Sequence, residues 1–362
     1  MPARAPFAEL EVARVDRLCA DAAAVTFAVP AGLAGQFEFR PGQSLTLRRL
    51  IDGREERRSY SICSPAGTAP RIGVREVPGG AISGWLVREV RPGDRIEVQP
   101  PAGSFALDPD PGLTRHVLIA AGSGITPILS IAASALARPQ TRATLLYGNR
   151  RADSVMFADE VADLKDAYTG RLQLVHVLSR ETQEVELFSG RLDAARLRRL
   201  LPATCDIAAV DHWWLCGPYG MVTDAQAVLA ELAVPPQRVH RELFYVEDEP
   251  PEPQQHAEPA GPGAPGHGAG PASAVTVILD GRATTTSLGR DTAVLDGAQR
   301  VRPDLPFACK GGVCGTCRAR VRTGQVTMRR NFALDPAEVA AGYVLTCQSL
   351  PASDEVTIDY DA

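Results

Sequence analysis

The chain has 362 residues, of which 45% are hydrophobic and 22% charged, and its formal net charge is -5. This length predicts two or three domains, each large enough for a core of its own, in a soluble globular protein. The acidic balance argues against a nucleic-acid partner, because neutralising phosphate groups requires a basic surface. We see no leader with an apolar segment and therefore expect a cytoplasmic chain with reduced thiols and no membrane partner.

Residues 1–110 consist of short runs of alternating apolar and polar side chains, interrupted by Gly and Pro. This pattern predicts a small antiparallel β-barrel. The expected strands are residues 22–29, 44–49, 72–76 and 95–98.

Two motifs in this region resemble the flavin-binding signatures of the ferredoxin-NADP reductase superfamily. The first is R-x-Y-S, with Arg58, Tyr60 and Ser61, and the second is the loop Gly80, Ala81, Ile82 and Ser83. The resemblance implies that the barrel binds FAD through these residues and Val74. Arg58 can hold a pyrophosphate with two parallel hydrogen bonds, Tyr60 offers a ring face, and Ser61 can hydrogen-bond the reactive edge of the flavin. We expect a helix to begin at the second motif with Ser83 as its cap, where free backbone N–H groups favour phosphate.

Residues 117–137 contain no charged side chain and are long enough to span a bilayer. Their interior, residues 121–127, contains two glycines and a proline, which contradicts a membrane span. We expect instead a buried strand over residues 117–120, a tight turn and a helix over residues 128–137.

Residues 111–246 alternate between short apolar strands and helix-like segments. This alternation predicts a Rossmann-like α/β domain, in which a parallel sheet binds a nucleotide at the carboxyl ends of its strands. The expected strands are residues 117–120, 143–147, 173–177 and 213–216.

Three further motifs in this domain resemble the same superfamily. The resemblance implies that the glycine turn approaches a dinucleotide pyrophosphate, with its threonine near the flavin. It also implies that the C-G-P-x-x-M element lies beside the nicotinamide and that an acidic and an aromatic residue close over the flavin. We expect Ser61, Cys216 and Glu242 to be catalytic. The alternative to a catalytic role for Cys216 is that it is a small core residue. The alternative for Glu242 is that it is an ordinary residue at a strand end. The residues concerned are Gly122, Gly124 and Thr126, then Cys216, Gly217, Pro218 and Met221, then Glu242 and Phe244.

The choice of nicotinamide cofactor depends on arginines near two strand ends. Ser179 and Arg180 resemble the Ser-Arg pair that holds the 2'-phosphate in NADPH-dependent members, and Arg150 follows another strand. The companion Lys-x-Tyr of plant-type reductases is absent. We expect NADPH, with NADH as the alternative, because solvated surface arginines would give the same sequence.

Residues 247–273 are rich in Glu, Pro and Gly and cannot form a core, so we expect a disordered linker. Two strands, around residues 275–282 and 282–287, and a helix at residues 293–300 should follow. This order resembles the β-grasp fold of plant-type 2Fe-2S ferredoxins over residues 274–362. The whole chain is thus a predicted multidomain α+β protein.

Four cysteines near the C-terminus, Cys309, Cys314, Cys317 and Cys347, follow the spacing C-x4-C-x2-C and then one distant cysteine. Glycines in the loop would let backbone N–H groups turn toward cluster sulfurs. The resemblance to plant-type ferredoxins implies Cys309 and Cys314 on one iron and the other two on the second. Zinc is the alternative, but it usually takes two short ligand pairs far apart. We expect the other cysteines, Cys19, Cys63 and Cys205, to be core residues.

Three modules in this order predict a path for electrons, in which a hydride delivers two electrons to the flavin and the cluster exports them singly. No oxygenase centre, heme-ligand pattern or hydrolase arrangement is visible in the sequence. We therefore expect the final acceptor to be another protein.

Five segments carry a further resemblance, residues 146–150, 176–181, 309–319, 331–334 and 341–348. Through them nearly the whole chain resembles the family of reductase subunits of phenylacetyl-CoA epoxidases, from which only the long linker departs. The resemblance implies electron transfer from NADPH to a diiron oxygenase component that epoxidises the ring of phenylacetyl-CoA. Two alternatives remain open: a reductase for a Rieske or other hydroxylase of ketosteroid or phthalate type, and a non-enzymatic redox sensor.

Overall fold

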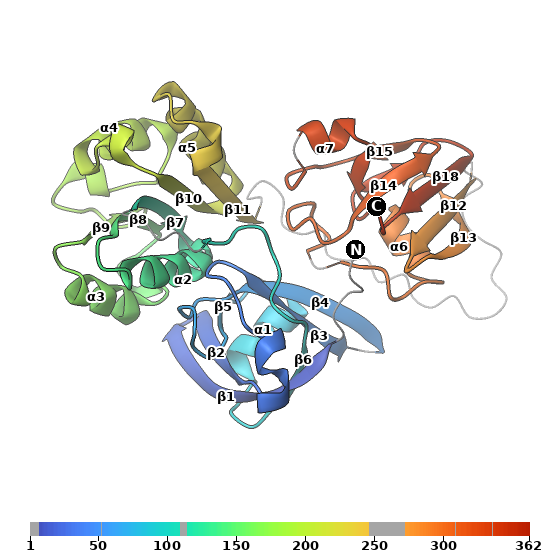
Figure 1. Cartoon of the computed structure of the whole chain (residues 1–362), viewed down its shortest axis with the longest axis horizontal. Helices are drawn as coiled ribbons and strands as arrows, with labels where there is room; N and C mark the ends of the chain where they lie inside the picture. The colour runs from blue at the N-terminus through green and yellow to red at the C-terminus, as the bar shows by residue number, and fades with distance from the viewer. Residues whose placement is uncertain (1–6, 52, 109–113, 246–271, 308, 335) are drawn as a thin grey trace. The chain divides into compact units, whose positions relative to one another are not determined.

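The computed structural model describes residues 7–51, 53–108, 114–245, 272–307, 309–334 and 336–362 (Figure 1). These residues form two compact units, one from the part before residue 246 and the other from the part after residue 271. Most of the predicted linker, 247–273, lies outside the described residues. Its last two residues belong to a strand that begins at Ala272.

The first part of the first unit is a six-stranded antiparallel sheet in the order β4-β3-β6-β1-β2-β5. A bridge between Ile62 and Ile72 joins its two ends, so the sheet closes into the predicted barrel. Alternating apolar side chains such as Leu45 and Leu47 fill the interior. The elements are β1 (Ala8–Cys19), β2 (Ala22–Ala28), the 3-10 helix η1 (Ala31–Gln36), β3 (Ser44–Ile51), β4 (Arg54–Ser61), β5 (Arg71–Arg75), α1 (Ala81–Arg88) and β6 (Arg95–Val98).

The expectation that Ser83 caps helix α1 was wrong. Gly80 is the N-cap residue, and Ser83 is the third residue of the helix. The Ser83 hydroxyl accepts a hydrogen bond from the N–H of Val77 at 3.1 Å and donates one to the carbonyl of Gly80 at 3.2 Å. Ser83 therefore fixes the loop before the helix, because its hydroxyl is held by that loop instead of by the helix N-terminus.

The second part of the first unit is a five-stranded parallel sheet in the order β11-β10-β7-β8-β9. Helices α2 and α3 pack on one face, and α4 and α5 cover the other (Figure 1). The chain runs outward from β7 in one direction and from β10 in the other. The carboxyl ends of these two strands are thus the topological switch point, where α/β sheets of this kind bind ligands in a crevice. The elements are β7 (Arg115–Ala121), η2 (Gly122–Gly124), α2 (Ile125–Leu136), β8 (Arg142–Asn149), η3 (Ala152–Ser154), α3 (Ala158–Ala167), β9 (Leu172–Leu178), η4 (Glu186–Phe188), α4 (Ala194–Thr204), η5 (Ile207–Ala209), β10 (His212–Pro218), α5 (Tyr219–Glu231), η6 (Pro236–Arg238) and β11 (Val239–Tyr245).

The uncharged segment 117–137 forms β7, η2 and α2, as predicted. Its strand lies in the centre of the parallel sheet, so its apolar side chains belong to a core. None of the described helices combines the length and the apolar composition that crossing a bilayer requires.

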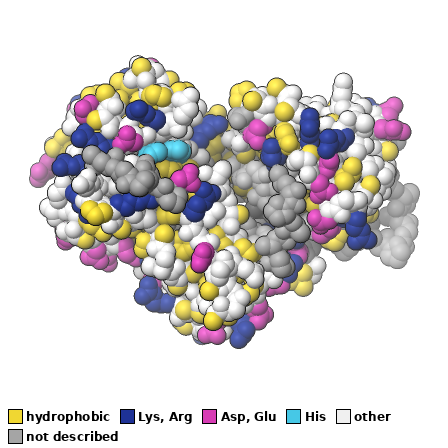
Figure 2. All heavy atoms as spheres, viewed as in Figure 1, with side chains coloured by type: hydrophobic (Ala, Val, Ile, Leu, Met, Phe, Trp, Pro, Cys, Tyr) yellow, Lys and Arg dark blue, Asp and Glu magenta, His cyan; other side chains and the backbone are white. Residues whose placement is uncertain are grey.

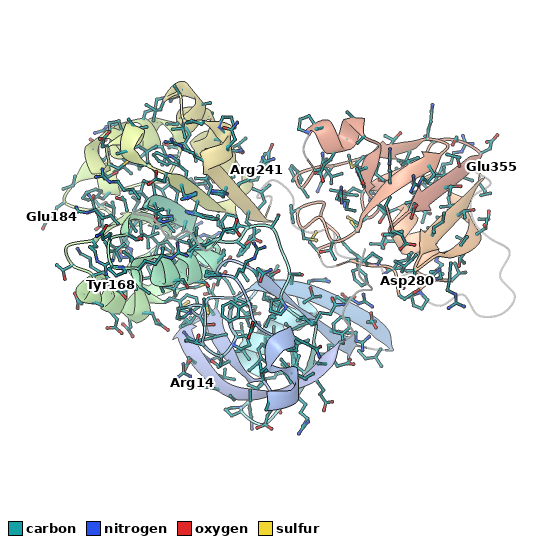
Figure 3. All side chains as sticks on the ribbon, in the orientation of Figure 1. Arg14, Tyr168, Glu184, Arg241, Asp280 and Glu355 are labelled. Carbon is teal, nitrogen blue, oxygen red and sulfur yellow. The ribbon has the colours of Figure 1, made fainter. Side chains whose placement is uncertain are left out.

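The second unit is a mixed five-stranded sheet in the order β13-β12-β18-β14-β16, with a two-stranded ribbon of β15 and β17. Asp280, in the turn between β12 and β13, and Glu355, at the start of β18, lie at opposite ends of this sheet (Figure 3). The elements are β12 (Ala272–Leu279), β13 (Arg282–Gly289), α6 (Val294–Ala298), β14 (Arg318–Thr323), β15 (Val326–Met328), α7 (Pro336–Ala340), β16 (Tyr343–Leu345), β17 (Ser349–Pro351) and β18 (Glu355–Asp359).

Candidate cofactor-binding sites

The three residues that we expect to be catalytic lie together where the barrel meets the parallel sheet. Ser61, the last residue of β4, donates a hydrogen bond from Oγ to Oε2 of Glu242 at 3.1 Å. Glu242 on β11 lies directly beside Cys216 on β10, and Cys216 is fully buried. Burial raises the pKa of Glu242 to about 8, against the opposing effect of the hydrogen bond from Ser61. Burial, and secondarily the neighbouring Glu242, raises the pKa of the Cys216 thiol. Both groups are therefore mostly protonated at neutral pH.

We expect the raised pKa of Glu242 to make the fold less stable as the pH rises. The folded chain keeps this proton up to about pH 8, whereas the unfolded chain loses it near pH 4.5. Stability should therefore fall between these two values and then level off. Glu242→Gln cannot ionise, so its stability relative to the wild type should increase by about 2–3 kcal/mol between pH 6 and pH 9. Urea denaturation at the two pH values measures this difference.

Glu184→Gln provides the control for this comparison, because Glu184 is an exposed carboxylate elsewhere in the first unit (Figure 3). Its stability should follow the wild type at both pH values. A constant difference between Glu242→Gln and the wild type from pH 6 to pH 9 would contradict the assignment.

The glycine turn after β7 packs directly against the end of β10. A Cβ atom on Gly124 would lie 2.1 Å from the carbonyl oxygen of Cys216, so only glycine permits this contact. A Cβ atom on Gly217 would lie 2.8 Å from Cε of Met221. Gly122 has φ +54°, in the left-handed region that favours glycine. The structure thus brings Gly122, Gly124, Gly217 and Met221 to the crevice at the carboxyl ends of β7 and β10, with Pro218 as the N-cap of α5.

Barrel strand β5 also touches the start of helix α2. Thr126 is fully buried and donates a hydrogen bond from Oγ1 to the carbonyl of Ser123 at 2.9 Å. A Cβ atom on Gly73 would lie 2.4 Å from Cγ2 of Thr126 and 2.7 Å from the ring of Phe157. Sequence analysis did not identify Gly73, although an isolated glycine in a strand is a known signal of close packing. Phe244 packs at the edge of the same core.

The remaining predicted flavin residues lie on β4, β5 and α1. The first N–H groups of α1, from Ala81, Ile82 and Ser83, have no acceptor within the helix, as phosphate binding requires. Arg58 pairs with Glu56 at 3.1 Å, and the Tyr60 ring packs against the barrel core. The side chain of Val74 is buried in that core, so only its backbone is available to a ligand.

Arg150, Ser179 and Arg180 lie side by side at the carboxyl ends of β8 and β9. The N–H of Arg180 donates to the carbonyl of Arg150 at 2.8 Å, and the N–H of Ser179 donates to the carbonyl of Asn149 at 2.9 Å. Within the described part of the chain, neither guanidinium has a hydrogen-bond or ion-pair partner. The neighbouring Arg151, in contrast, lies 3.6 Å from Glu181. The carboxyl ends of β8 and β9 therefore have two arginines available for an anionic ligand.

The four C-terminal cysteines form two pairs in the second unit. The thiol of Cys309 lies close to that of Cys314, and the thiol of Cys347 lies close to that of Cys317. The contact with Cys314, followed by hydrogen bonds from the N–H groups of Gly311, Val313 and Cys314, lowers the pKa of Cys309. The first of these N–H groups lies 3.3 Å from Sγ of Cys309. The same contact, together with burial, raises the pKa of Cys314, so the loop favours the thiolate at Cys309. This fits an iron ligand, because the thiolate is the form that binds metal.

The grouping of the four thiols suits the ligation of two irons. In the regions that the structure describes, no three His, Cys, Asp or Glu side chains converge on one metal position. The pairs observed, 309 with 314 and 317 with 347, are those that ligation of a 2Fe-2S cluster in the plant-type pattern would need. The donor set therefore fits the cluster.

Gln348 and Arg330 also contribute to the cluster loop, and the sequence analysis did not identify them. The Gln348 amide donates to the carbonyl of Lys310 at 2.7 Å and to Sγ of Cys347 at 3.7 Å. A Cβ atom on Gly312, which has φ +79°, would lie 3.1 Å from Gln348 and 3.3 Å from the carbonyl oxygen of Arg330. These contacts join segments far apart in the sequence, so no local pattern could have indicated them.

Comparisons with known proteins agree with this geometry. Residues 9–107 match the oxidoreductase FAD-binding domain, residues 118–227 the oxidoreductase NAD-binding domain, and residues 277–352 the 2Fe-2S iron-sulfur cluster binding domain. The chain is therefore an oxidoreductase with an FAD-binding domain, an NAD-binding domain and a 2Fe-2S domain. The predicted fold class and set of cofactor-binding domains are confirmed.

Relatives of similar length define the family more closely. One subunit of the 1,2-phenylacetyl-CoA epoxidase from Escherichia coli (strain K12) is 41% identical over 98% of both chains. The chain belongs to the family of this epoxidase subunit. The ferredoxin reductase component of 3-ketosteroid-9-alpha-monooxygenase from Mycobacterium tuberculosis is 36% identical over 98% of this chain and 96% of its own. The solved structure of phthalate dioxygenase reductase shares the fold, with a TM-score of 0.63 and 22% identity over 98% of both chains.

Proposed function

We propose that this chain is the reductase that carries electrons from NADPH to the oxygenase component of a phenylacetyl-CoA epoxidase in the cytoplasm. The observation that carries the proposal is the 41% identity to the Escherichia coli epoxidase subunit, which extends across all three domains. When bound, FAD accepts a hydride from the nicotinamide, and the cluster passes single electrons onward.

The residues of the chain would bind and orient these groups. The N–H groups at the start of α1 and Arg58 would hold the flavin phosphates, and the glycine turn would let the dinucleotide backbone approach closely. Glu242, held by Ser61, would keep a proton in the crevice at neutral pH. The paired thiols of the second unit would ligate the two irons.

Reconstitution with purified oxygenase components tests the acceptor. The chain, NADPH and the oxygenase subunits of a phenylacetyl-CoA epoxidase should form the epoxide of phenylacetyl-CoA. The oxygenase of a 3-ketosteroid-9-alpha-monooxygenase serves as the comparison, because its reductase is 36% identical to this chain. Product from the second oxygenase alone would favour the ketosteroid type and overturn the proposal. A purely sensory protein would show no turnover, so cytochrome c reduction at about one per second or faster contradicts that alternative.

Arg180 should determine the preference for NADPH over NADH. Its guanidinium has no partner among the described residues, and its backbone N–H donates to the carbonyl of Arg150 at the strand ends. A charge-assisted hydrogen bond contributes about 1.5–3 kcal/mol, which corresponds to roughly tenfold or more in binding. We expect Arg180→Gln to raise the KM for NADPH at least tenfold and to leave the KM for NADH nearly unchanged. Steady-state kinetics with both cofactors measures this.

Arg199→Gln is the matched control, because it removes one exposed arginine from helix α4 of the same domain. It should change neither KM. An equal rise in both KM values for Arg180→Gln would show that Arg180 does not contact the 2'-phosphate.

A further inference from the structure

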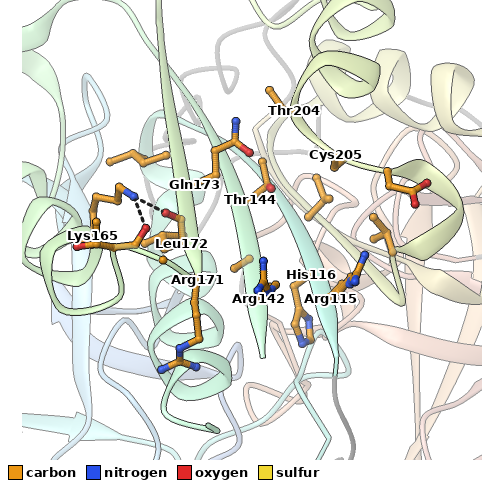
Figure 4. A pocket seen from close by; sticks show the side chains of 17 residues that line it. Arg115, His116, Arg142, Thr144, Lys165, Arg171, Leu172, Gln173, Thr204 and Cys205 are labelled. Carbon is orange, nitrogen blue, oxygen red and sulfur yellow. Dashed lines mark hydrogen bonds between the residues drawn. The ribbon is translucent and has the colours of Figure 1, made fainter. Parts of the chain in front are cut away.

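A pocket lies at the amino end of the parallel sheet, opposite the cofactor crevice. Its volume is about 560 Å³, and it is lined by the first residues of β7, β8 and β9, the loop after α3 and the residues that follow α4 (Figure 4). Each of these strands has seven or eight residues and is thus about 20 Å long. The pocket is therefore separate from the site that we assign to the nicotinamide cofactor.

The lining of this pocket is strongly basic. Four cationic side chains line it, Arg115, Arg142, Lys165 and Arg171, against a single acid, Asp206. On the face shown in Figure 2, by contrast, Lys and Arg side chains of this unit lie among Asp and Glu side chains. The pocket thus concentrates positive charge in a chain whose net charge is -5.

Two of the four cations are held in place by backbone carbonyls. Lys165 donates to the carbonyls of Thr169 at 2.9 Å and Leu172 at 2.7 Å. Arg171 donates to the carbonyl of Arg138 at 2.7 Å. Because carbonyl groups are neutral, these hydrogen bonds do not neutralise the positive charges of Lys165 and Arg171.

The other two cations begin neighbouring strands of the sheet. Arg115 and Arg142 occupy the same register position on neighbouring strands β7 and β8. In the described ranges, neither guanidinium forms a hydrogen bond or an ion pair. Like charges on adjacent strands repel, so an anion between them would stabilise this arrangement.

Two polar side chains of the pocket lie on the same face of the sheet as Arg142, two residues farther along the strands. Thr144 lies two residues after Arg142 and therefore on the same face, and Gln173 is its register neighbour on β9. Thr144 is only 8% exposed, yet its hydroxyl has no partner among the described residues. A hydroxyl that lines a cavity and has no partner there is suited to hydrogen-bond a ligand.

We propose that this pocket binds a phosphorylated small organic molecule. Arg115 and Arg142 would hold the phosphate, because guanidinium groups match phosphate oxygens with paired hydrogen bonds. The volume is within the range of small-molecule sites and exceeds the size of an inorganic phosphate. Thr144 and Gln173 would then bind the polar part of the organic group.

Isothermal titration of the holoprotein with 5'-AMP and with inorganic pyrophosphate tests the proposal. Arg142→Gln should weaken one binding event per chain at least tenfold, and the double variant R115Q/R142Q should abolish it. Arg199→Gln is the control, because it removes the same charge from the same domain outside the pocket. It should bind both probes like the wild type.

The rate of flavin reduction by NADPH verifies that the variants are folded. Arg115 and Arg142 lie away from the cofactor crevice, so this rate should stay at the wild-type value. Binding of both probes that is identical in Arg142→Gln and Arg199→Gln would overturn the proposal. Binding of pyrophosphate but not of 5'-AMP at the affected site would overturn the organic part of it.

Discussion

Replacing Gly124 with alanine should reduce NADPH-dependent flavin reduction more than 100-fold. The new Cβ atom would lie 2.1 Å from the carbonyl oxygen of Cys216 and 2.8 Å from the backbone nitrogen of Gly217. These are backbone atoms of a central strand and cannot rotate away, so the turn or the strand must shift. Such overpacking costs about 1–3 kcal/mol of stability. A displacement of 1 Å in a reacting site can cost about 100-fold in rate.

Stopped-flow absorption at the flavin band and thermal denaturation measure these two effects. The matched control is Gly220→Ala in helix α5, where an added Cβ atom would meet no atom within 4 Å. Alanine favours a helix by up to about 1 kcal/mol over glycine, so this variant should be at least as stable as the wild type. Flavin reduction by Gly124→Ala at the wild-type rate would contradict the role assigned to this contact.

Replacing Cys347 with serine should stop electron transfer to cytochrome c and leave hydride transfer to the flavin intact. Cys347 is buried, pairs with Cys317 and accepts a hydrogen bond from Gln348. Loss of one of four thiolates should prevent stable assembly of the cluster, which contains about two irons per chain. The second unit is compact by itself, so we expect the damage to remain within it. Iron content, visible absorption and the two partial reactions measure the outcome.

Cys19→Ser is the control for this experiment, because Cys19 lies in the barrel and its thiol donates to Asp21 at 3.2 Å. Serine can make the same hydrogen bond, so iron content and both partial reactions should match the wild type. If Cys347→Ser lost flavin reduction together with cytochrome c reduction, the two units would not work as separate modules.

Local sequence patterns predicted most of the architecture because they report strand alternation, glycine turns and ligand spacing. They missed strand β4, which begins with five consecutive charged residues, residues 54–58, and thus lacks an alternating pattern. It becomes a strand because it pairs with β3 along its whole length. The hydrogen bond between Ser61 and Glu242 joins residues 181 positions apart, so only the fold could show it.

Local sequence patterns could not predict the basic pocket either, because they do not report contacts between distant segments. Arg115 and Arg142 belong to different strands, and their adjacency depends on the register between those strands. The cap assignment to Ser83 failed for a more local reason, since the loop before α1 competes for its hydroxyl. Motifs whose residues are consecutive in the chain were thus easier to predict than contacts between segments.

The strand order of the second unit determines when its cluster site can form during synthesis. Strand β18, Glu355–Asp359, lies in the middle of the sheet, between β12 and β14. The sheet therefore stays incomplete until these residues have left the ribosome, whereas the elements of the first unit have emerged by residue 245. The flavin-binding unit can fold while the chain is still being made. We therefore expect iron and sulfide to be inserted only after residue 359 has been synthesised.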